Sequence, residues 1–411
     1  MNPERLLERF LRYVAIDTTA DPAAEVYPSS AGQWTLGKLL VEELREIGLE
    51  DAEQDEHGLI WATLPAAGSS AAATMAWNSH MDTSPETSGA NIQPQVLRDY
   101  AGGDIPLPGD SGKVIRVAEN PELQHLHGRT LITTDGTTLL GADDKAGVAV
   151  IVEACAQLVE HPEIAHGPIK ILFTCDEEIG HGVMHVDLQK LNAQGGYTLD
   201  GAGAGVIDVE TFNAQQAKVT VRGVNIHPSI AKDRMVNAVR AAAVFIDKMP
   251  RDRMAPESTD GRDGFLHPYN LCGGVEETTI EILLRDFDTA NIQQQADLLR
   301  RLAQQVEQEC PGVSVDVDIH QQYSNMGDGL TACPQIVERA EEAFKRLGRP
   351  YKKDIVRGGT DGSLLTEQGL PTPNLSTGQH NPHSPLEWAC LEEMVEAVEV
   401  LVELAKIWGE V

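Results

Sequence analysis

The spacing of apolar residues predicts helices and short strands in the first part of the chain. Asn2 and Pro3 are typical of a helix start, and apolar residues then recur at helical spacing as far as Val14. Apolar runs at 59–64 and 74–78 are short enough to be strands. We therefore expect an amphipathic N-terminal helix and, after a second helix, two strands.

Residues 84–129 interrupt this pattern with a long stretch rich in proline, glycine and aspartate. Because it is too long for an ordinary connection, we expect a functional or edge-covering excursion. Beyond it, 146–159 has helical spacing, and 169–174 is a near-continuous apolar run of the kind found in strands covered on both faces. This alternation predicts an α/β domain with a largely parallel central sheet, in which ligands bind beyond the carboxyl ends of the strands.

The pattern changes between residues 217 and 323. The order there is strand, helix, strand, helix, strand, predicted at 217–221, 237–248, 278–285, 290–308 and 313–319. This order resembles a split βαβ, ferredoxin-like α+β arrangement, which leaves an edge strand available to a second copy of the chain. Since α/β character returns afterwards, we predict a main domain over 1–213 and 326–411, with an inserted domain over 214–325.

Composition narrows the class of protein. A chain of 411 residues with 41% hydrophobic content can bury a full core, enough for roughly two or three domains. The formal net charge of −31 makes nucleic acid and anionic membranes unfavourable partners. No apolar run approaches the roughly 20 residues of a membrane span, and no secretory signal pattern begins the sequence, so we expect a cytoplasmic protein.

Two adjacent acids, Asp143 and Asp144, interrupt an apolar stretch immediately before a predicted helix. Buried carboxylates that repel each other need protonation, a basic partner or a metal ion. Further candidate groups occur where other apolar runs end: His80 with Asp82, Glu177 with Glu178, Asp200, and His383. Together these residues indicate a two-metal hydrolase.

Side-chain direction separates the roles within these groups. Residues two apart in a strand point to the same side, so His80 can bind a metal while Asp82 accepts a hydrogen bond from the other ring nitrogen. Adjacent residues point to opposite sides, so one acid of 143–144 and one of 177–178 reaches a metal, and the second glutamate is available as a general base. Each motif alone has an ordinary alternative, a satisfied buried pair or a charged strand end. Taken together, the ligands match two ions that lie about 3.5–4 Å apart and share one carboxylate.

Nearly the whole chain resembles the co-catalytic zinc metallopeptidases, a family that includes dipeptidases, aminoacylases and glutamate carboxypeptidases, and within that family the aminotripeptidase branch. The motifs that carry the resemblance cover 79–85, 133–136, 139–147, 176–178, 200–201, 225–228 and 357–362. The resemblance implies a zinc-peptidase-like catalytic domain at 1–213 and 326–411, and a lid and dimerisation domain at 214–325. It also implies a homodimer that releases the N-terminal residue of tripeptides.

The resemblance further implies roles for individual residues. Two Zn²⁺ ions per subunit are expected, and Co²⁺ or Mn²⁺ suit the same ligand types. The expected metal ligands are His80 and Asp200 for one ion, Glu178 and His383 for the other, and Asp143 as the bridge. The remaining expectations are Glu177 as general base, Asp82 as the acid that orients His80, and a cis peptide bond after Asp143.

The resemblance also implies that three further residues act on the substrate. His227 is expected to reach the partner subunit's active site and stabilise the oxyanion there. Arg357 is expected to bind the terminal carboxylate of the substrate, because guanidinium geometry matches a carboxylate. Arg285 is a second candidate for that task, and a structural ion pair is the alternative for Arg357.

The choice of the last histidine and of the substrate leaves alternatives. His383 is preferred to His380 because Glu387 lies four residues further on, as in the family's His-x-x-x-Glu pattern.

The function also has alternatives. A metal-dependent dipeptidase or an N-acyl amino acid amidohydrolase uses the same scaffold. A non-catalytic metal- or peptide-binding protein is the alternative from another class, and the presence of Glu177 as a base argues against it.

Overall fold

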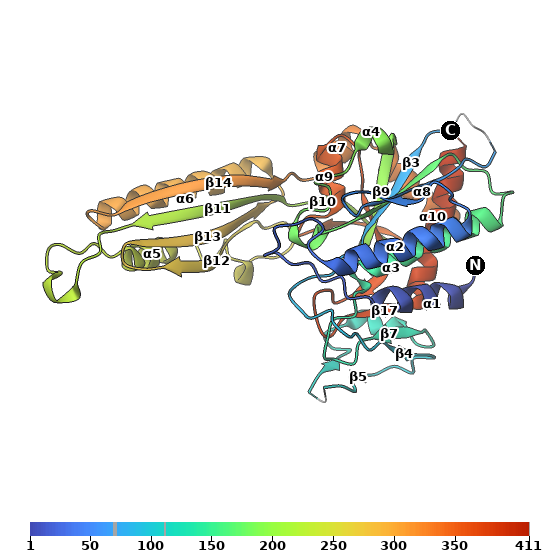
Figure 1. The fold of residues 1–411 in the computed structure, drawn as a ribbon, viewed down its shortest axis with the longest axis horizontal. Helices are drawn as coiled ribbons and strands as arrows, with labels where there is room; N and C mark the ends of the chain where they lie inside the picture. The colour runs from blue at the N-terminus through green and yellow to red at the C-terminus, as the bar shows by residue number, and fades with distance from the viewer. Residues whose placement is uncertain (69–71, 111, 411) are drawn as a thin grey trace. The chain divides into compact units, whose positions relative to one another are not determined.

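A computed structural model describes residues 1–68, 72–110 and 112–410, and the chain divides into two compact units (Figure 1). Unit 1 comprises Met1–Val209, Asp328–Asp354 and Thr360–Val411, and unit 2 comprises Glu210–Gly327 and Ile355–Gly359. The short segment 355–359, which we placed in the main domain from the sequence, groups with unit 2. There the backbone N–H of Phe212 donates to the Gly358 carbonyl at 3.2 Å.

Apart from the separate hairpin of β5 (Ile105–Pro106) and β6 (Val114–Ile115), the described strands of unit 1 form one sheet in the order β1-β2-β8-β3-β9-β16-β17-β7-β4, and β10 pairs with both β16 and β15. Their bounds are β1 Glu53–Gln54, β2 Ile60–Leu64, β3 Met75–His80, β4 Gln95–Leu97, β7 Leu131–Thr133, β8 Ile169–Thr174, β9 Gly195–Ala202, β10 Val206–Thr211, β15 Lys352–Val356, β16 Asn374–His380 and β17 Trp388–Cys390. The four central strands β8, β3, β9 and β16 are parallel to one another, and the flanking pairs are antiparallel. The largely parallel centre agrees with the predicted fold class.

Helices cover both faces of this sheet. They are α1 Pro3–Val14, α2 Ala31–Ile47, α3 Ala142–Glu160, α4 Leu188–Leu191, α7 Gly327–Ala332, α8 Gln335–Arg346, α9 Asp361–Glu367 and α10 Leu391–Gly409. Helix α3 packs on β3, β9 and β16, and α10 packs on α3 and β16. Leu191 of α4 and Leu365 of α9 join a separate cluster with Trp61, Ala76 and Leu172 of the sheet. Every residue of β3 is buried, because side chains on both faces meet packed helices.

The excursion at 84–129 contains β4, the short hairpin β5 (Ile105–Pro106) with β6 (Val114–Ile115), and the 3-10 turn η1 (Pro121–His125). Its apolar residues, among them Leu107 and Leu123, pack around the fully buried Trp388. The excursion therefore has a small core of its own beside the edge strands β17, β7 and β4. No helix among the described residues is both long and apolar enough to span a membrane.

Unit 2 is a four-stranded antiparallel sheet with two helices. Its elements are β11 Asn213–Arg222, α5 Ala238–Asp247, β12 Phe265–Gly273, β13 Glu277–Asp286, α6 Thr289–Glu309 and β14 Ser314–Tyr323, and the sheet order is β12-β13-β11-β14. Burial alternates along β13, and its inward residues share one core with α5 and α6. This is the β-α-β-β-α-β order of a ferredoxin-like arrangement. Strand β12 was not predicted, because it contains Pro268 and is mostly exposed.

Candidate active site

The candidate residues lie at one edge of the central sheet. His80 is the last residue of β3, Glu178 follows β8, Asp200 lies near the end of β9 and His383 follows β16. Because these four strands are parallel neighbours, their carboxyl ends meet. Asp143 joins them from the first turn of α3. Residues from five separate segments therefore form one cluster.

The carboxylate of Asp143 stands between two imidazole–carboxylate pairs. Its Oδ1 lies 3.1 Å from His80 Nε2, which is 3.7 Å from Asp200 Oδ1. Its Oδ2 lies 3.3 Å from His383 Nε2, which is 2.9 Å from Glu178 Oε2. Each oxygen of Asp143 thus faces a different pair, which is the arrangement of a carboxylate shared by two binding positions.

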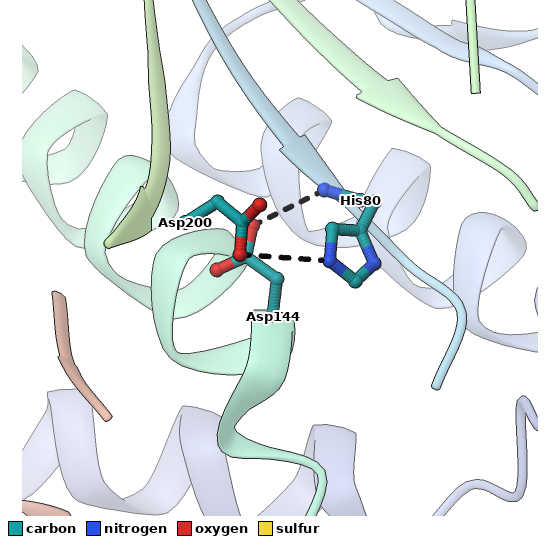
Figure 2. Close-up of side chains that lie close together, drawn as sticks. All are labelled: His80, Asp144 and Asp200. Carbon is teal, nitrogen blue, oxygen red and sulfur yellow. Dashed lines mark hydrogen bonds and ion pairs between the residues drawn. The ribbon is translucent and has the colours of Figure 1, made fainter. Parts of the chain in front are cut away.

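Asp144 is directed differently from Asp143. Its fully buried carboxylate accepts a hydrogen bond from the Ser79 hydroxyl. It also accepts one from the backbone N–H of His80 at 3.2 Å (Figure 2). The Asp143–Asp144 peptide bond is cis, as the family resemblance implied. Ligand atoms that lie within 4.8 Å of one another define two groups able to hold an ion: His80 with Asp144 and Asp200, and His80 with Asp143 and Glu178.

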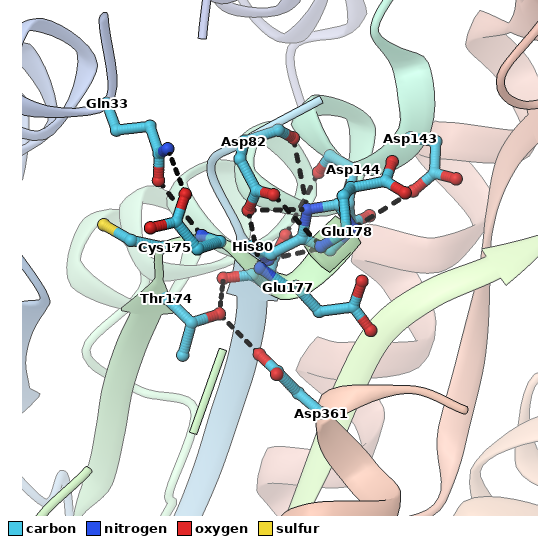
Figure 3. A network of polar contacts seen from close by, with 12 residues as sticks. Gln33, His80, Asp82, Asp143, Asp144, Thr174, Cys175, Glu177, Glu178 and Asp361 are labelled. Atoms are coloured by element: carbon cyan, nitrogen blue, oxygen red, sulfur yellow. Dashed lines mark hydrogen bonds and ion pairs between the residues drawn. The ribbon is translucent and has the colours of Figure 1, made fainter. Parts of the chain in front are cut away.

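Asp82 connects the histidine of one strand to the acidic loop of the next. Its Oδ1 lies 3.4 Å from His80 Nδ1, on the side of the ring opposite Asp143. Its two oxygens also accept the backbone N–H groups of Glu177 and Glu178, each at 3.1 Å (Figure 3). His80 Nδ1 also lies 3.2 Å from the Asp82 backbone carbonyl oxygen, so Asp82 orients the ring through both groups. Its buried carboxylate in addition fixes the loop that carries both glutamates.

Burial shifts the pKa values of the candidate ligands. It raises the pKa of Asp200 to about 7 and that of Glu178 to about 8, and the charge of Asp143 adds to both shifts. Burial also raises the pKa of Asp143, but hydrogen bonds with His383 and His80 outweigh it, so the pKa of Asp143 lies below its usual range. The cluster holds more buried carboxylates than imidazoles, and such an excess of negative charge favours divalent cations.

Glu177 lies beside the ligands but points its carboxylate elsewhere. Figure 3 shows it on the same loop as Glu178, near Asp361. Burial raises its pKa well above the usual range, and the charges of Asp200 and Asp361 act in the same direction against the opposing effect of His80. A carboxyl group in this environment has a greater affinity for a proton than an exposed glutamate has.

The ligand atoms present fit a divalent metal. The set consists of imidazole nitrogens and carboxylate oxygens, which suit zinc, cobalt and manganese. Among the described residues, the proposed ligand Glu178 has a buried oxygen, Oε1, without a hydrogen-bond partner. Buried acceptors of this kind need a partner, and cations at this cluster would supply it.

Comparison with known proteins identifies the family. The model of "Peptidase family M20/M25/M40" matches residues 134–407. The chain belongs to this peptidase family. Peptidase T from Geobacillus kaustophilus is 44% identical over 99% of both chains, and peptidase T from Bacillus subtilis is 42% identical over 98% of both. The family match and these relatives identify the protein as a peptidase, and peptidases are hydrolases.

Solved structures agree with this assignment. Aminopeptidase PepT from Bacillus cereus covers 99% of both chains with a TM-score of 0.75 and 26% identity. A tripeptidase from Staphylococcus aureus covers 100% of both chains with a TM-score of 0.78 and 25% identity. The M20/M25/M40 peptidase thus shares its architecture with these enzymes over its whole length.

The three remaining predicted residues of this peptidase lie in unit 2. His227 is exposed, caps the 3-10 turn η3 (Pro228–Ile230), and has its Nδ1 2.7 Å from the Ser229 hydroxyl. Arg357 donates to the carbonyls of Gly261 and Asp263 at 2.8 Å each.

The second arginine of unit 2, Arg285, is more enclosed. It donates to the carbonyls of Gln215 and Leu284 at 3.0 and 2.9 Å, and its guanidinium group lies over the Tyr323 ring. The partners of both arginines belong to unit 2, so each arginine helps to hold unit 2 together.

His380, the fallback for the last ligand, has other partners. Its Nε2 lies 2.7 Å from Glu393, its Nδ1 lies 3.6 Å from Glu122, and its ring stacks on Trp388 with centroids 3.7 Å apart. Burial lowers the pKa of His380, but the two glutamates outweigh it and raise the value. In the structure His383, and not His380, contacts Glu178.

Two residues of the site were missed from the sequence. Asn374 Oδ1 accepts the backbone N–H of Asp200 at 3.0 Å, and Asn374 Nδ2 donates to Asp208 at 3.0 Å. Glu387, used only to choose His383, bonds to the backbone around Asp143. No local pattern marks Asn374, because its partner Asp200 lies 174 residues away in the chain.

Proposed function

We propose that this peptidase is a two-metal aminopeptidase that releases the N-terminal residue of tripeptides. The observation that carries the proposal is the placement of the two Asp143 oxygens against two separate imidazole–carboxylate pairs. His80 and Asp200 would hold one ion, Glu178 and His383 the other, and Asp143 both. The tripeptide substrate is supported by the names of the relatives, peptidase T and a tripeptidase.

Zinc is the proposed metal, since two imidazoles and three carboxylates suit it, and cobalt or manganese could replace it. Such ions would supply a Lewis acid for the scissile carbonyl and would lower the pKa of a bound water. Asp82 keeps the His80 ring and the glutamate loop in place through its hydrogen bonds. The protein thus supplies a fixed set of ligands before the substrate arrives.

Glu177 is the proposed general base. It would take a proton from the attacking water and return it to the amine that leaves. The support is its position: it precedes Glu178 directly, its backbone N–H is held by Asp82, and its carboxylate lies apart from the ligand pairs (Figure 3). Two adjacent glutamates therefore divide binding and proton transfer between them.

We further propose a homodimer formed through unit 2, with His227 stabilising the oxyanion at the partner's site. The sheet of unit 2 ends in the edge strands β12 and β14, and the exposed apolar residues Val224 and Ile230 lie close to His227 in the chain. Light scattering at working concentration should show particles of two chains. Particles of a single chain would contradict the role of His227.

Arg357 is proposed to bind the terminal carboxylate, ahead of Arg285. Both arginines donate to backbone carbonyls, but the Arg285 guanidinium is also covered by Tyr323. Arg357 uses three of its five N–H groups on two backbone carbonyls and the Thr259 hydroxyl. A substrate carboxylate would bind the others or replace one of these partners. Such a contact would explain a preference for short peptides, because it fixes the distance between the carboxyl end and the scissile bond.

A matched series of di-, tri- and tetrapeptides tests the proposed function. With zinc-loaded protein, the tripeptide should be cleaved fastest and should yield its N-terminal amino acid and a dipeptide, both identified by mass spectrometry. The N-acetylated tripeptide is the control and should resist cleavage. Faster cleavage of dipeptides or of N-acyl amino acids would instead identify a dipeptidase or an amidohydrolase, and absence of all turnover would indicate a binding protein.

A further inference from the structure

Glu387 uses its whole carboxylate on the backbone of the loop that precedes Asp143. Its Oε2 accepts the N–H groups of Leu140 at 2.6 Å and Gly141 at 2.8 Å, and its Oε1 accepts the N–H of Asp143 at 3.0 Å. Glu387 is 1% exposed, so these bonds form away from water. Hydrogen bonds from backbone N–H groups to a buried carboxylate are stronger than those between neutral groups, and losing one leaves a buried group unsatisfied.

Asp143 is thereby held on both sides. Its own N–H is fixed by Glu387, and the next residue, Asp144, is anchored by the Ser79 hydroxyl and the His80 N–H. Between these anchors the Asp143 carboxylate faces both imidazole–carboxylate pairs. A small shift of its backbone would move one oxygen away from its pair, since the contacts at the two ends are 3.1 and 3.3 Å.

Glu387 also links two of the ligand segments. It lies four residues after His383, so its bonds join the loop that carries His383 to the loop that carries Asp143, two segments 244 residues apart in the chain. Asp82 does the same for β3 and the glutamate loop, because it contacts His80 and accepts the N–H groups of Glu177 and Glu178. The loop that carries Asp143 and the loop that carries Glu178 are thus each held by a buried carboxylate that is not itself one of the proposed ligands.

We infer that Glu387 is a positioning residue that fixes the Asp143 carboxylate between the two metal positions, an inference that rests on the proposed two-metal function. It acts through the backbone of residues 140–143 and touches neither the substrate nor the reacting atoms. Its loss should therefore weaken metal binding and lower kcat more than it changes KM. Groups that position metal ligands typically affect metal affinity by roughly 10–100-fold.

The test is a zinc titration of the full-length protein against a competing chelator. Glu387→Gln keeps the size of the side chain but replaces one acceptor oxygen with an NH₂ donor, which then faces a backbone N–H. We expect zinc to bind this variant roughly 10–100-fold more weakly than the wild type. Glu387→Asp keeps the charge but shortens the side chain by one methylene. It should also bind zinc more weakly than the wild type, and it replaces the glutamine variant in the test if that variant does not fold.

Glu392→Gln is the matched control. Glu392 also accepts a backbone N–H through both oxygens, from Thr130 at 3.1 and 2.8 Å, and its hydrogen bonds within the described part of the chain do not involve a ligand loop. Its variant should bind zinc like the wild type. A wild type that binds fewer than two ions per chain overturns the proposed function. If the wild type binds two ions, two results overturn the role of Glu387 alone. One is an unchanged zinc affinity in both Glu387 variants, and the other is an equal loss of zinc affinity in the Glu392 variant.

Discussion

Glu177→Ala should bind two zinc ions per chain and yet lose peptide cleavage, with kcat lower by about 10²–10⁴-fold, the usual contribution of a general acid–base group. The reason is positional: the Glu177 carboxylate lies apart from the two imidazole–carboxylate pairs that contact Asp143. Removing it takes away the proton carrier and leaves the ligand atoms in place. KM for a tripeptide should change little, because the residue is proposed to act on the proton and not on substrate binding.

The neighbouring residue provides the contrast for this experiment. Glu178→Ala removes an oxygen that lies 2.9 Å from His383 Nε2, so it should lose zinc as well as activity. Zinc content by mass spectrometry and kcat at saturating zinc would be measured for both variants. Undiminished turnover by a zinc-loaded Glu177→Ala protein would show that another group carries the proton.

Asp143→Asn should abolish tight binding of the metal pair and reduce activity by more than about 10³-fold. The amide keeps one weak oxygen ligand and replaces the other with an NH₂ group, which cannot bind a cation. Because each oxygen of Asp143 faces a different pair, one substitution affects both metal positions. The stoichiometry of bound zinc should fall below two per chain.

Asp144→Asn is the control for the neighbouring acid. Asp144 accepts hydrogen bonds from Ser79 and from the His80 N–H, and an amide oxygen can accept these bonds as well. We expect its zinc affinity to fall much less than that of Asp143→Asn. If Asp144→Asn loses the metal and Asp143→Asn keeps it, the shared carboxylate has been assigned to the wrong residue of the pair.

Strand and helix positions near the site could be predicted well where the pattern of apolar residues was strong. The run 169–174 coincides with β8, because apolar residues are needed on both faces of that strand. The prediction for 74–78 ended before His80, whereas β3 continues through it. The sequence does not show whether the backbone of a polar residue at a strand end still pairs with the neighbouring strand. Strand β12 was missed because exposed edge strands lack alternating apolar residues.

Four residues of the cluster were predictable because they follow or end apolar runs, and parallel strands bring their carboxyl ends together. Asp143 was predictable because its acid pair interrupts an apolar stretch before a helix. What supports them was not predictable. The bonds from Glu387 to the Asp143 loop and from Asn374 to Asp200 join segments far apart in the chain, and they depend on the final packing. Likewise, the engagement of Arg357 by the carbonyls of Gly261 and Asp263 has no signature in its own motif.

The most direct test of the two-metal centre is anomalous diffraction from crystals of the zinc-loaded protein at the zinc absorption edge. The proposal predicts two peaks per chain about 3.5–4 Å apart, one beside His80 and Asp200, the other beside Glu178 and His383, with the Asp143 carboxylate bound to both. A single peak, or a pair of peaks without Asp143 between them, would contradict it.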